Sequence, residues 1–278
     1  MRTIAIINQK GGVGKTTSAV NLAAALAEAG KQVCLVDLDP QAHASLHLGV
    51  SADMQGTSIY DVLIGQSSLG EVRQRIADNL WLVPSHLDLT AAEVELAGEV
   101  GREVILRDRM LSDAAEFDYV LVDCPPSLGV LTLNALVAVN EVFLPLQPHF
   151  LALHGLSKLL GTVDVVAQRL NGRLRVTGIM ICMNEPSTRL AAEVKRDAKS
   201  FFMAIDDPSC PWFGARLFET SIRRNIRLAE APSYGQSIFE YAPHSNGAQD
   251  YRQLAEEVIT TSTEYETGVR QSRSYSTR

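Results

Sequence analysis

The strongest constraint on this chain is a glycine-rich segment at residues 10–17 (KGGVGKTT), which separates an apolar run at residues 3–8 from an Ala/Leu-rich helical pattern. Gly11, Gly12 and Gly14 let successive backbone N–H groups point inward, because glycine tolerates backbone angles that other residues avoid. The helix that follows puts a partial positive charge behind the loop. A strand, a glycine-rich turn and a helix in this order predict a loop that cradles phosphate groups.

The same loop carries two lysines. Lys15 is expected to reach the β- and γ-phosphates of a nucleotide, and the Thr16 hydroxyl is expected to bind Mg²⁺. The ordinary motif has a glycine where this chain has Gln9, and a second lysine, Lys10, stands just before the glycines. The expected nucleotide-binding residues of the loop are Lys10, Gly11, Gly12, Val13, Gly14, Lys15, Thr16 and Thr17.

Apolar, strand-like runs alternate with helical patterns along the rest of the chain. The runs lie at residues 3–8, 32–37, 80–83, 119–123, 142–146 and 176–183, with a weaker one at 216–218. The helical patterns lie at residues 15–29, 91–115, 152–170, 189–202 and 248–261. This alternation predicts a single-domain α/β fold of the P-loop nucleotide hydrolase (NTPase) type, with a mostly parallel, twisted β-sheet and helices on both faces.

The domain is expected to span residues 1–265, because no linker or internal repeat divides them. Residues 266–278 are rich in Ser, Arg and Thr without apolar periodicity, so a flexible C-terminal tail is expected. No apolar run reaches the roughly 18 residues that a membrane span requires. Three of the four cysteines, Cys34, Cys124 and Cys182, lie in or beside apolar runs, which favours buried, inert thiols and a cytoplasmic location.

Three aspartates stand at or just after the ends of two of the apolar runs. Asp37 and Asp39 stand where the second run ends, and Asp123 closes the run at residues 119–123. The carboxyl ends of parallel strands meet at one edge of a sheet, where ligands bind, so these carboxylates are candidates for holding Mg²⁺. An aspartate at a strand end is also often a turn or cap residue, and for each one alone that alternative stays open.

The loop with its extra lysine resembles the deviant Walker A motif of the ParA/MinD superfamily of ATPases. Residues 38–41 (LDPQ) resemble the switch I of that superfamily, and residues 123–129 (DCPPSLG) resemble its Walker B and switch II. Residues 225–235 (NIRLAEAPSYG) resemble a block typical of the ParA/Soj branch. The resemblance covers nearly all of residues 2–260.

The resemblance implies a homodimer that forms on ATP, with ATP/ADP and Mg²⁺ as cofactors. It implies that Lys10 crosses the interface to the partner's phosphates, and that Lys15 serves its own nucleotide. Asp39 would orient the attacking water and, with Thr16 and Asp123, stand at the metal. The catalytic residues would be Lys10, Lys15 and Asp39, and the base would lie among Met183, Asn184 and the segment around Arg224.

The chain also departs from the superfamily's pattern. Residues 42–45 read AHAS, where Gly-Asn-Ala-Thr is usual, and Arg223 stands where a proline is usual. His149 occupies a position where an acidic residue is commoner. His43 and His47 are four residues apart, a spacing that binds metal on a helix, although a solvent-facing switch loop is the favoured interpretation.

ParA-like ATPases bind nonspecific DNA, whereas MinD-like ATPases bind membranes. A membrane-targeting helix needs a large apolar face, and the tail offers only Val269 and Tyr275. The formal net charge of −7 restricts any DNA contact to a local patch. The candidate DNA-binding residues are Arg189, Lys195, Arg196, Lys199, Arg223, Arg224 and Arg227.

The resemblance therefore implies a nucleoid-associated ATPase that positions or partitions a chromosome, plasmid or other cargo, with a ParB-like or other cargo-bound protein that stimulates hydrolysis. The alternative is a MinD-like spatial regulator recruited to a membrane. An electron-transfer ATPase of the nitrogenase iron-protein type is disfavoured, because Cys124 is followed by Pro125 and not by a second cysteine.

Overall fold

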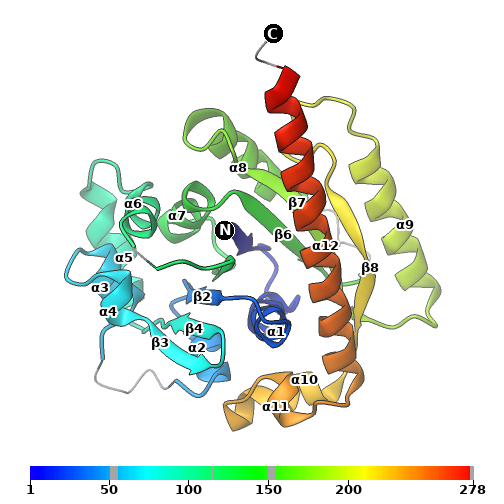
Figure 1. The fold of residues 1–278 in the computed structure, drawn as a ribbon, viewed down its shortest axis with the longest axis horizontal. Coiled ribbons are helices and arrows are strands. Elements are labelled where there is room, and N and C mark those ends of the chain that lie inside the picture. Colours follow the sequence, from blue (N-terminus) through cyan, green and yellow to red (C-terminus); the bar gives the residue numbers. More distant parts are fainter. Residues whose placement is uncertain (51–55, 114, 150–154, 276–278) are drawn as a thin grey trace.

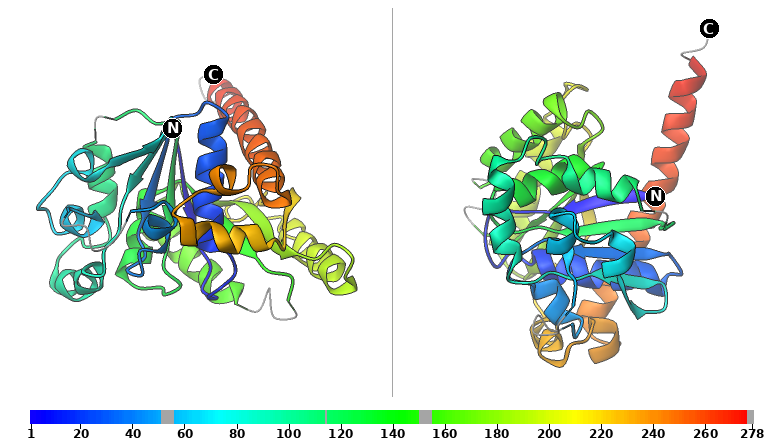
Figure 2. Two further views of the ribbon diagram at one scale, coloured as in Figure 1. Left: turned by 90° about the horizontal axis from the view of Figure 1, so that it is seen from below. Right: turned by 90° about the vertical axis from the view of Figure 1, so that its left-hand side faces the viewer.

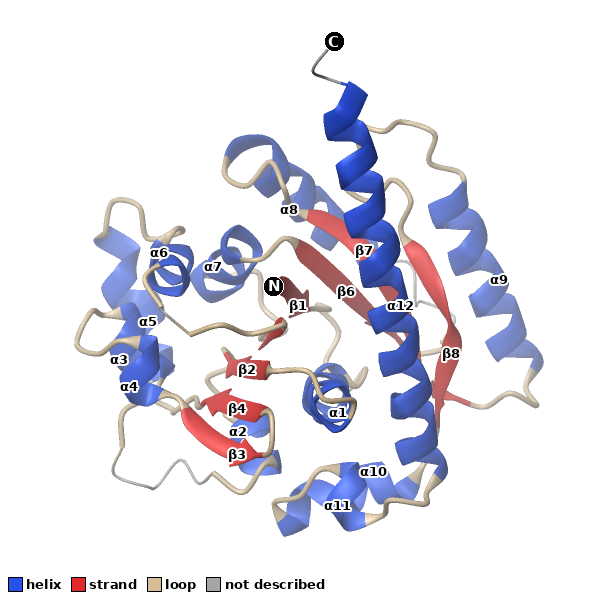
Figure 3. Ribbon diagram, viewed as in Figure 1, coloured by secondary structure: helices blue, strands red, loops and turns tan. Residues whose placement is uncertain are grey.

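The computed structural model describes residues 1–50, 56–113, 115–149 and 155–275, and for residues 262–275 it describes the backbone alone. The described strands form one sheet in the order β3-β4-β2-β5-β1-β6-β7-β8, in which only β3 is antiparallel to its neighbour (Figures 1 and 3). The strands are β1 (Arg2–Ile6), β2 (Val33–Asp37), β3 (Gln74–Ala77), β4 (Leu80–Val83), β5 (Tyr119–Asp123), β6 (Glu141–Leu146), β7 (Arg175–Asn184) and β8 (Arg216–Arg223).

Helices cover both faces of the sheet, as the edge-on view in Figure 2 shows. One core packs α1, α2, α11 and α12 on one face, and the other core packs α3 to α9 on the opposite face. The helices are α1 (Lys15–Glu28), α2 (His43–His47), α3 (Ile59–Leu63), α4 (Leu69–Val72), α5 (Leu89–Glu95), α6 (Ile105–Leu111), α7 (Val130–Ala138), α8 (Leu156–Arg169), α9 (Arg189–Met203), α10 (Ile226–Glu230), α11 (Ile238–Tyr241) and α12 (Asn246–Tyr275), with 3-10 turns η1 (Leu96–Gly98) and η2 (Ala231–Tyr234).

The central strand β5 shows why the sheet is buried on both sides. Val120 and Val122 pack into one core, whereas Tyr119 and Leu121 pack into the other, because successive side chains of a strand point to opposite faces. Every residue of β5 is buried. The continuous apolar runs of the sequence are thus explained, and the predicted single, mostly parallel sheet is confirmed.

Two local expectations were wrong or incomplete. A single helix at residues 91–115 does not form: α5, η1 and α6 replace it, and Gly101 adopts a left-handed backbone (φ 78°) ahead of α6. Glycine tolerates that conformation, which cannot continue a right-handed helix. The antiparallel strand β3 was not predicted; it joins β4 through a turn in which Asn79 has φ 60°.

The two later helices differ from the expectation at their ends. α8 begins at Leu156, and residues 152–154 of the predicted helix lie outside the described residues. α12 spans Asn246–Tyr275, so this helix extends at both ends beyond the predicted range of residues 248–261. The flexibility of residues 266–278 stays a prediction. In the described part of the chain, no helix combines the length and apolar character needed to cross a membrane.

Candidate active site

The glycine-rich loop lies between β1 and α1, and the side chain of Asn8 joins it to the end of β6 by hydrogen bonds. The Asn8 side chain accepts a hydrogen bond from the Lys10 N–H at 2.9 Å and donates to the Pro145 carbonyl at 2.7 Å. Gly12 and Gly14 adopt left-handed backbone angles (φ 73° and 92°), and Gly14 caps the N-terminus of α1. The loop therefore presents backbone N–H groups at a helix N-terminus, as a phosphate cradle requires.

The two lysines of the loop have different surroundings. Lys15 is buried, and its Nζ donates to the Lys10 carbonyl at 3.2 Å. Burial lowers the pKa of Lys15, and the carboxylates of Asp123 and Asp39 oppose that shift. The Lys10 residue is exposed. One lysine is thus directed into the chain's own site, while the other is available to a second molecule.

Asp123 ends β5 and is fully buried, yet neither of its carboxylate oxygens has a hydrogen-bond partner among the described residues. Burial raises the pKa of Asp123 well above its usual range, and the charge of Asp37 adds to the shift. Thr16 and Lys15 oppose it, so both lie near the carboxylate. A buried carboxylate with no donor at hydrogen-bond distance in the described structure, but with the Thr16 hydroxyl and the Lys15 ammonium nearby, fits Mg²⁺ bound by Thr16 and Asp123.

Asp37 and Asp39 have separate roles at the end of β2. Asp37 pairs in register with Asp123 and accepts hydrogen bonds from the Ser45 N–H (2.8 Å), the Ser45 hydroxyl (2.7 Å) and the Asp39 N–H (3.2 Å). Burial raises the pKa of Asp37 to about 6. Asp39 is 8% exposed, and its Oδ1 accepts from the Gln41 N–H. Asp37 therefore organises the loop, whereas Asp39 is the slightly more exposed of the two carboxylates.

The histidines after the switch I segment lie on the short helix α2. His43 is exposed, but His47 is 2% exposed, so the predicted solvent-facing loop is wrong for His47. Its Nε2 has no partner in the described structure, and burial lowers the pKa of His47 to about 4. Ala42, which precedes the helix, adopts a left-handed backbone (φ 53°) that favours the glycine usual at this position.

A cavity of about 450 Å³ lies beside the phosphate loop. Its lining joins Gly14 and Thr17 of the loop to Met183 and to Arg224, two of the residues predicted around the base. Asn184, the third, is not among the residues that line this cavity; its carbonyl accepts the Arg224 N–H at 3.0 Å. The size and apolar lining suit a nucleobase. The full lining is Gly14, Thr17, Cys182, Met183, Ile222, Arg223, Arg224, Asn225, Ile226, Leu228, Ala229 and Tyr251.

The predicted basic patch is largely neutralised within the chain. Arg223 pairs with buried Asp250 at 2.6 Å, and the Lys195 Nζ donates to the Glu219 carbonyl at 3.1 Å. Lys199 lines a separate groove. The remaining ion pairs of this set are Arg224–Glu185 (2.7 Å), Arg227–Glu230 (2.8 Å), Arg189–Glu193 (2.9 Å) and Arg196–Asp197 (3.4 Å).

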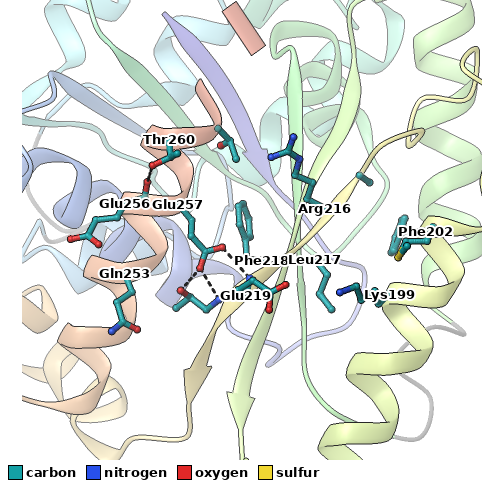
Figure 4. Close-up of a pocket in the computed structure, with 14 residues that line it drawn as sticks. Lys199, Phe202, Arg216, Leu217, Phe218, Glu219, Gln253, Glu256, Glu257 and Thr260 are labelled. Carbon is teal, nitrogen blue, oxygen red and sulfur yellow. Dashed lines mark hydrogen bonds between the residues drawn. The ribbon is translucent and has the colours of Figure 1, made fainter. Parts of the chain in front are cut away.

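That separate groove, of about 720 Å³, lies between α9, β8 and α12, away from the phosphate loop (Figure 4). Inside it, the Glu257 carboxylate of α12 accepts the N–H groups of Glu219 (3.0 Å) and Thr220 (2.7 Å) and the Thr220 hydroxyl. The groove contains none of the predicted phosphate or metal residues.

The predicted inert thiols are buried. Cys34, Cys124 and Cys182 are free cysteines, and burial raises the pKa of Cys34 to about 12 and that of Cys182 to about 11. Burial also raises the pKa of Cys124 well above its usual range. A thiol in this state is a poor nucleophile and a poor cluster ligand.

Sequence reasoning missed several residues that the fold brings to the site. The Ser85 N–H donates to the Ser45 hydroxyl, and the Ser85 hydroxyl donates to the Asp39 carbonyl, although Ser85 is 46 positions from Asp39. The hydroxyl oxygens of Ser18 and Tyr251 lie 3.1 Å apart, and Tyr251 lines the cavity beside the phosphate loop. One signal was available for Ser85: it is the first polar residue after the carboxyl end of the predicted strand at residues 80–83, separated from it by Pro84.

This geometry defines a P-loop ATPase: a glycine-rich loop at a strand–helix junction, a buried lysine and a buried strand-end carboxylate meet at the carboxyl edge of a parallel sheet. Comparison with known proteins agrees. A family model described as an AAA domain matches residues 1–176. The chromosome-partitioning ATPase Soj of Treponema pallidum is 44% identical over 259 residues, which cover 93% of this chain and 97% of Soj. The chain belongs to the ParA/Soj family of the ParA/MinD superfamily.

Other relatives agree. The Soj of Thermus thermophilus is 46% identical and covers 93% of this chain and 96% of its own length. Among solved structures, cobyrinic acid a,c-diamide synthase from Mycobacterium smegmatis with bound ADP and magnesium has a TM-score of 0.78 at 33% identity, covering 93% of this chain and 94% of that chain. The cell division ATPase MinD of Pyrococcus furiosus has a TM-score of 0.73 at 26% identity, covering 94% and 99%.

Proposed function

We propose that this ATPase forms a dimer on ATP, binds nonspecific double-stranded DNA, and partitions or positions a chromosome, plasmid or other cargo. A cargo-bound, ParB-like protein would stimulate its hydrolysis, and the dimer would associate with the nucleoid in the cytoplasm. The observation that carries the proposal is the contrast between Lys15, buried in its own site, and Lys10, exposed on the same loop. The curated relatives named for chromosome partitioning support the cargo class.

The chain's residues suit ATP and Mg²⁺ as cofactors. Bound Mg²⁺ supplies charge neutralisation at the β- and γ-phosphates. Thr16 and Asp123 would hold the ion, with Asp39 near Lys15 in the same site. Met183 and Arg224 would enclose the base within the cavity beside Gly14. The ADP and magnesium bound by the similar synthase support this arrangement.

Hydrolysis would depend on placement of charged groups with little covalent work by the protein. Lys15 would leave the Lys10 carbonyl and bind the phosphate oxygens. Asp39, which follows β2 and is less buried than the strand-end Asp37, would orient the attacking water. Lys10 of the second protomer would add a positive charge as negative charge develops on the phosphates, so that each site is complete only in the dimer.

DNA binding by the basic residues is compatible with their ion pairs. Surface pairs contribute little to stability, about 0–1 kcal/mol, so DNA phosphates can displace their carboxylates. The Arg224–Glu185 and Arg189–Glu193 pairs are of this exposed kind. Arg223 differs because its partner Asp250 is buried, and we assign it to the structure of the β8–α12 junction.

Two substitutions test the site. Lys15→Ala is expected to abolish ATP binding, measured by titration with a fluorescent ATP analogue.

Asp39→Ala is expected to keep ATP binding and to accumulate an ATP-bound dimer, measured by light scattering with Mg²⁺ and ATP. If Asp39→Ala hydrolysed ATP at the wild-type rate, the water-orienting role would be wrong.

DNA binding is tested with the double substitution Arg224→Ala/Arg227→Ala. Removing one phosphate-binding side chain reduces the slope of log K against log salt by about 1, so the variant should bind random duplex DNA more weakly and with less salt dependence. Arg75→Ala is the matched control, because Arg75 is an exposed, ion-paired arginine on β3, at the opposite edge of the sheet. Equal reductions in both variants would contradict the assignment.

A membrane-recruited regulator of the MinD kind is the second candidate. The observation in its favour is that α12 continues as a helix through Tyr275, as a terminal membrane-binding helix must. ATP-dependent retention on vesicles rich in anionic phosphatidylglycerol, without retention on DNA, would establish this alternative in place of the DNA-binding proposal.

A further inference from the structure

Four buried polar residues form a hydrogen-bonded network around the switch I segment: Asp37, Asp39, Ser45 and Ser85, which are 0%, 8%, 0% and 3% exposed. They come from the end of β2 and the residues after it, from α2, and from the residues after β4, and β2 and β4 are neighbours in the sheet.

The bonds of this network run from one residue to the next. Asp37 accepts the N–H and the hydroxyl of Ser45, and it also accepts the N–H of Asp39. The Ser45 hydroxyl oxygen in turn accepts the Ser85 N–H at 2.9 Å. The Ser85 hydroxyl then donates to the Asp39 carbonyl at 2.8 Å.

The consequence is that both peptide groups flanking Asp39 are held by side chains. Its N–H is bound by Asp37, and its carbonyl is bound by Ser85. Buried hydrogen bonds restrict motion strongly, because a polar group that leaves its partner inside the protein loses the bond without gaining water. The backbone on both sides of Asp39 is therefore held by residues outside the phosphate loop. The Asp39 carbonyl also accepts the Ala42 N–H at 2.8 Å, and the Asp39 Oδ1 accepts the Gln41 N–H.

We propose that Ser45 and Ser85 are positioning residues for ATP hydrolysis, which act by fixing the backbone of Asp39 so that its carboxylate meets the attacking water. This rests on the role of Asp39 in the proposed function. A displacement of about 1 Å in such a group can lower a reaction rate by roughly 100-fold. The two serines would thus control turnover while leaving the phosphate cradle and the base cavity untouched.

The first test compares Ser45→Ala and Ser85→Ala with the wild type in single-turnover hydrolysis of ATP with Mg²⁺ by the full chain. We expect the hydrolysis rate to fall roughly 10- to 100-fold, while the Kd for the ATP analogue changes less than about 3-fold. Ser45→Thr keeps the hydroxyl and should retain most of the rate. If Ser85→Ala folds poorly, Ser85→Cys replaces it in the test. Cysteine is close to serine in size but is a weaker donor, so this variant should also lower the hydrolysis rate.

The matched control is Ser58→Ala. Ser58 is 5% exposed and caps α3 with hydrogen bonds to Tyr60 and Asp61, none of which involves a residue of the network. It should lower the melting temperature without changing the hydrolysis rate. If Ser45→Ala and Ser85→Ala behaved as Ser58→Ala does, losing stability at an unchanged hydrolysis rate, the network would be purely structural and the proposal would be overturned.

A double substitution separates this proposal from the proposed function. If Ser85 acts through Asp39, then Ser85→Ala/Asp39→Ala should hydrolyse ATP as slowly as Asp39→Ala alone. A further decrease in the double variant would show that Ser85 acts elsewhere. An unchanged rate in Asp39→Ala alone would refute the role of Asp39, whatever the serine variants do.

Discussion

The imidazole of His47 is packed inside the protein beside the switch I segment, with Nε2 unpartnered among the described residues. Burial lowers the pKa of His47 to about 4, and a hydrogen bond with the Gln236 backbone opposes the shift only in part. Because a histidine in the unfolded chain has a pKa of about 6.5, the unfolded state binds the proton more readily than the folded state between these values.

Stability should therefore fall as the pH falls from about 6.5 toward 4, and His47→Gln should remove this component. Between pH 7 and pH 5, the wild type should lose on the order of 2 kcal/mol more than His47→Gln in urea unfolding. The difference between the two proteins is the measurement, because the raised pKa of Asp37 changes stability in the opposite direction in both. Parallel pH profiles would contradict the prediction.

Close packing around Gly178 in β7 leaves no room for a larger residue. A Cβ at this position would lie 2.6 Å from the Phe218 ring and 2.8 Å from the Phe143 ring, and these two rings pack edge to face. Gly178→Ala should cost about 1–3 kcal/mol in unfolding free energy by overpacking. Gly161→Ala is the control: it lies in α8 with nothing within 4 Å of its Cβ, so helix propensity should make it neutral or stabilising.

At the scale of elements, β8 is the edge strand of the sheet, and α12 protects its backbone. The Glu257 carboxylate accepts the consecutive N–H groups of Glu219 and Thr220, visible as dashed lines in Figure 4. Asp250 accepts the Arg223 N–H and pairs with its guanidinium. These side chains occupy donors that would otherwise be open to another strand, which is how proteins avoid edge-to-edge association.

Glu257→Gln should weaken this junction, because an amide NH₂ replaces one of the two oxygens that face donors. We expect a decrease of about 1 kcal/mol in the free energy of unfolding by denaturant, discounted for the partial exposure of the site, and faster amide exchange at Glu219 and Thr220. Glu256→Gln, one position away on the exposed face of α12, should change neither quantity. A decrease shared by both variants would assign the effect to charge and not to the hydrogen bonds.

At the scale of the whole molecule, the sheet order places β2, β5 and β1 next to one another, so Asp37, Asp123 and the phosphate loop meet at one edge. The buried Asp123 carboxylate has no hydrogen-bond partner there among the described residues, which costs stability in the absence of an ion. Binding of a cation would relieve that cost.

Asp123→Asn should therefore raise the melting temperature of the nucleotide-free protein and abolish the extra stabilisation by Mg²⁺. With ATP and Mg²⁺ at about 100 times the Kd, the free energy of unfolding of the wild type should rise by about 2.7 kcal/mol. In the variant, the stabilisation by ATP should not depend on whether Mg²⁺ is present. Calorimetry of both proteins with EDTA and with Mg²⁺ checks this. A variant that retains the full Mg²⁺ response would exclude Asp123 as a ligand.

The phosphate loop, the strands at residues 80–83 and 119–123 and the two-faced sheet could all be predicted, because their information is local. The burial of a contiguous apolar run and the backbone freedom of a glycine pattern are determined by neighbouring residues alone. The helix at 91–115 was predicted wrongly, because its periodicity continued across Gly98 and Gly101, where the backbone turns.

The amino-acid sequence by itself determined the chemistry of this protein: a phosphate loop with two lysines, and the aspartates that follow β2 and β5. Only the tertiary structure decided which polar groups are already engaged. Arg223 meets Asp250 from 27 positions away, and Ser85 reaches Asp39 from 46. Such contacts depend on strand order and helix packing, which bring distant residues within hydrogen-bonding distance, so no local pattern of residues can specify them.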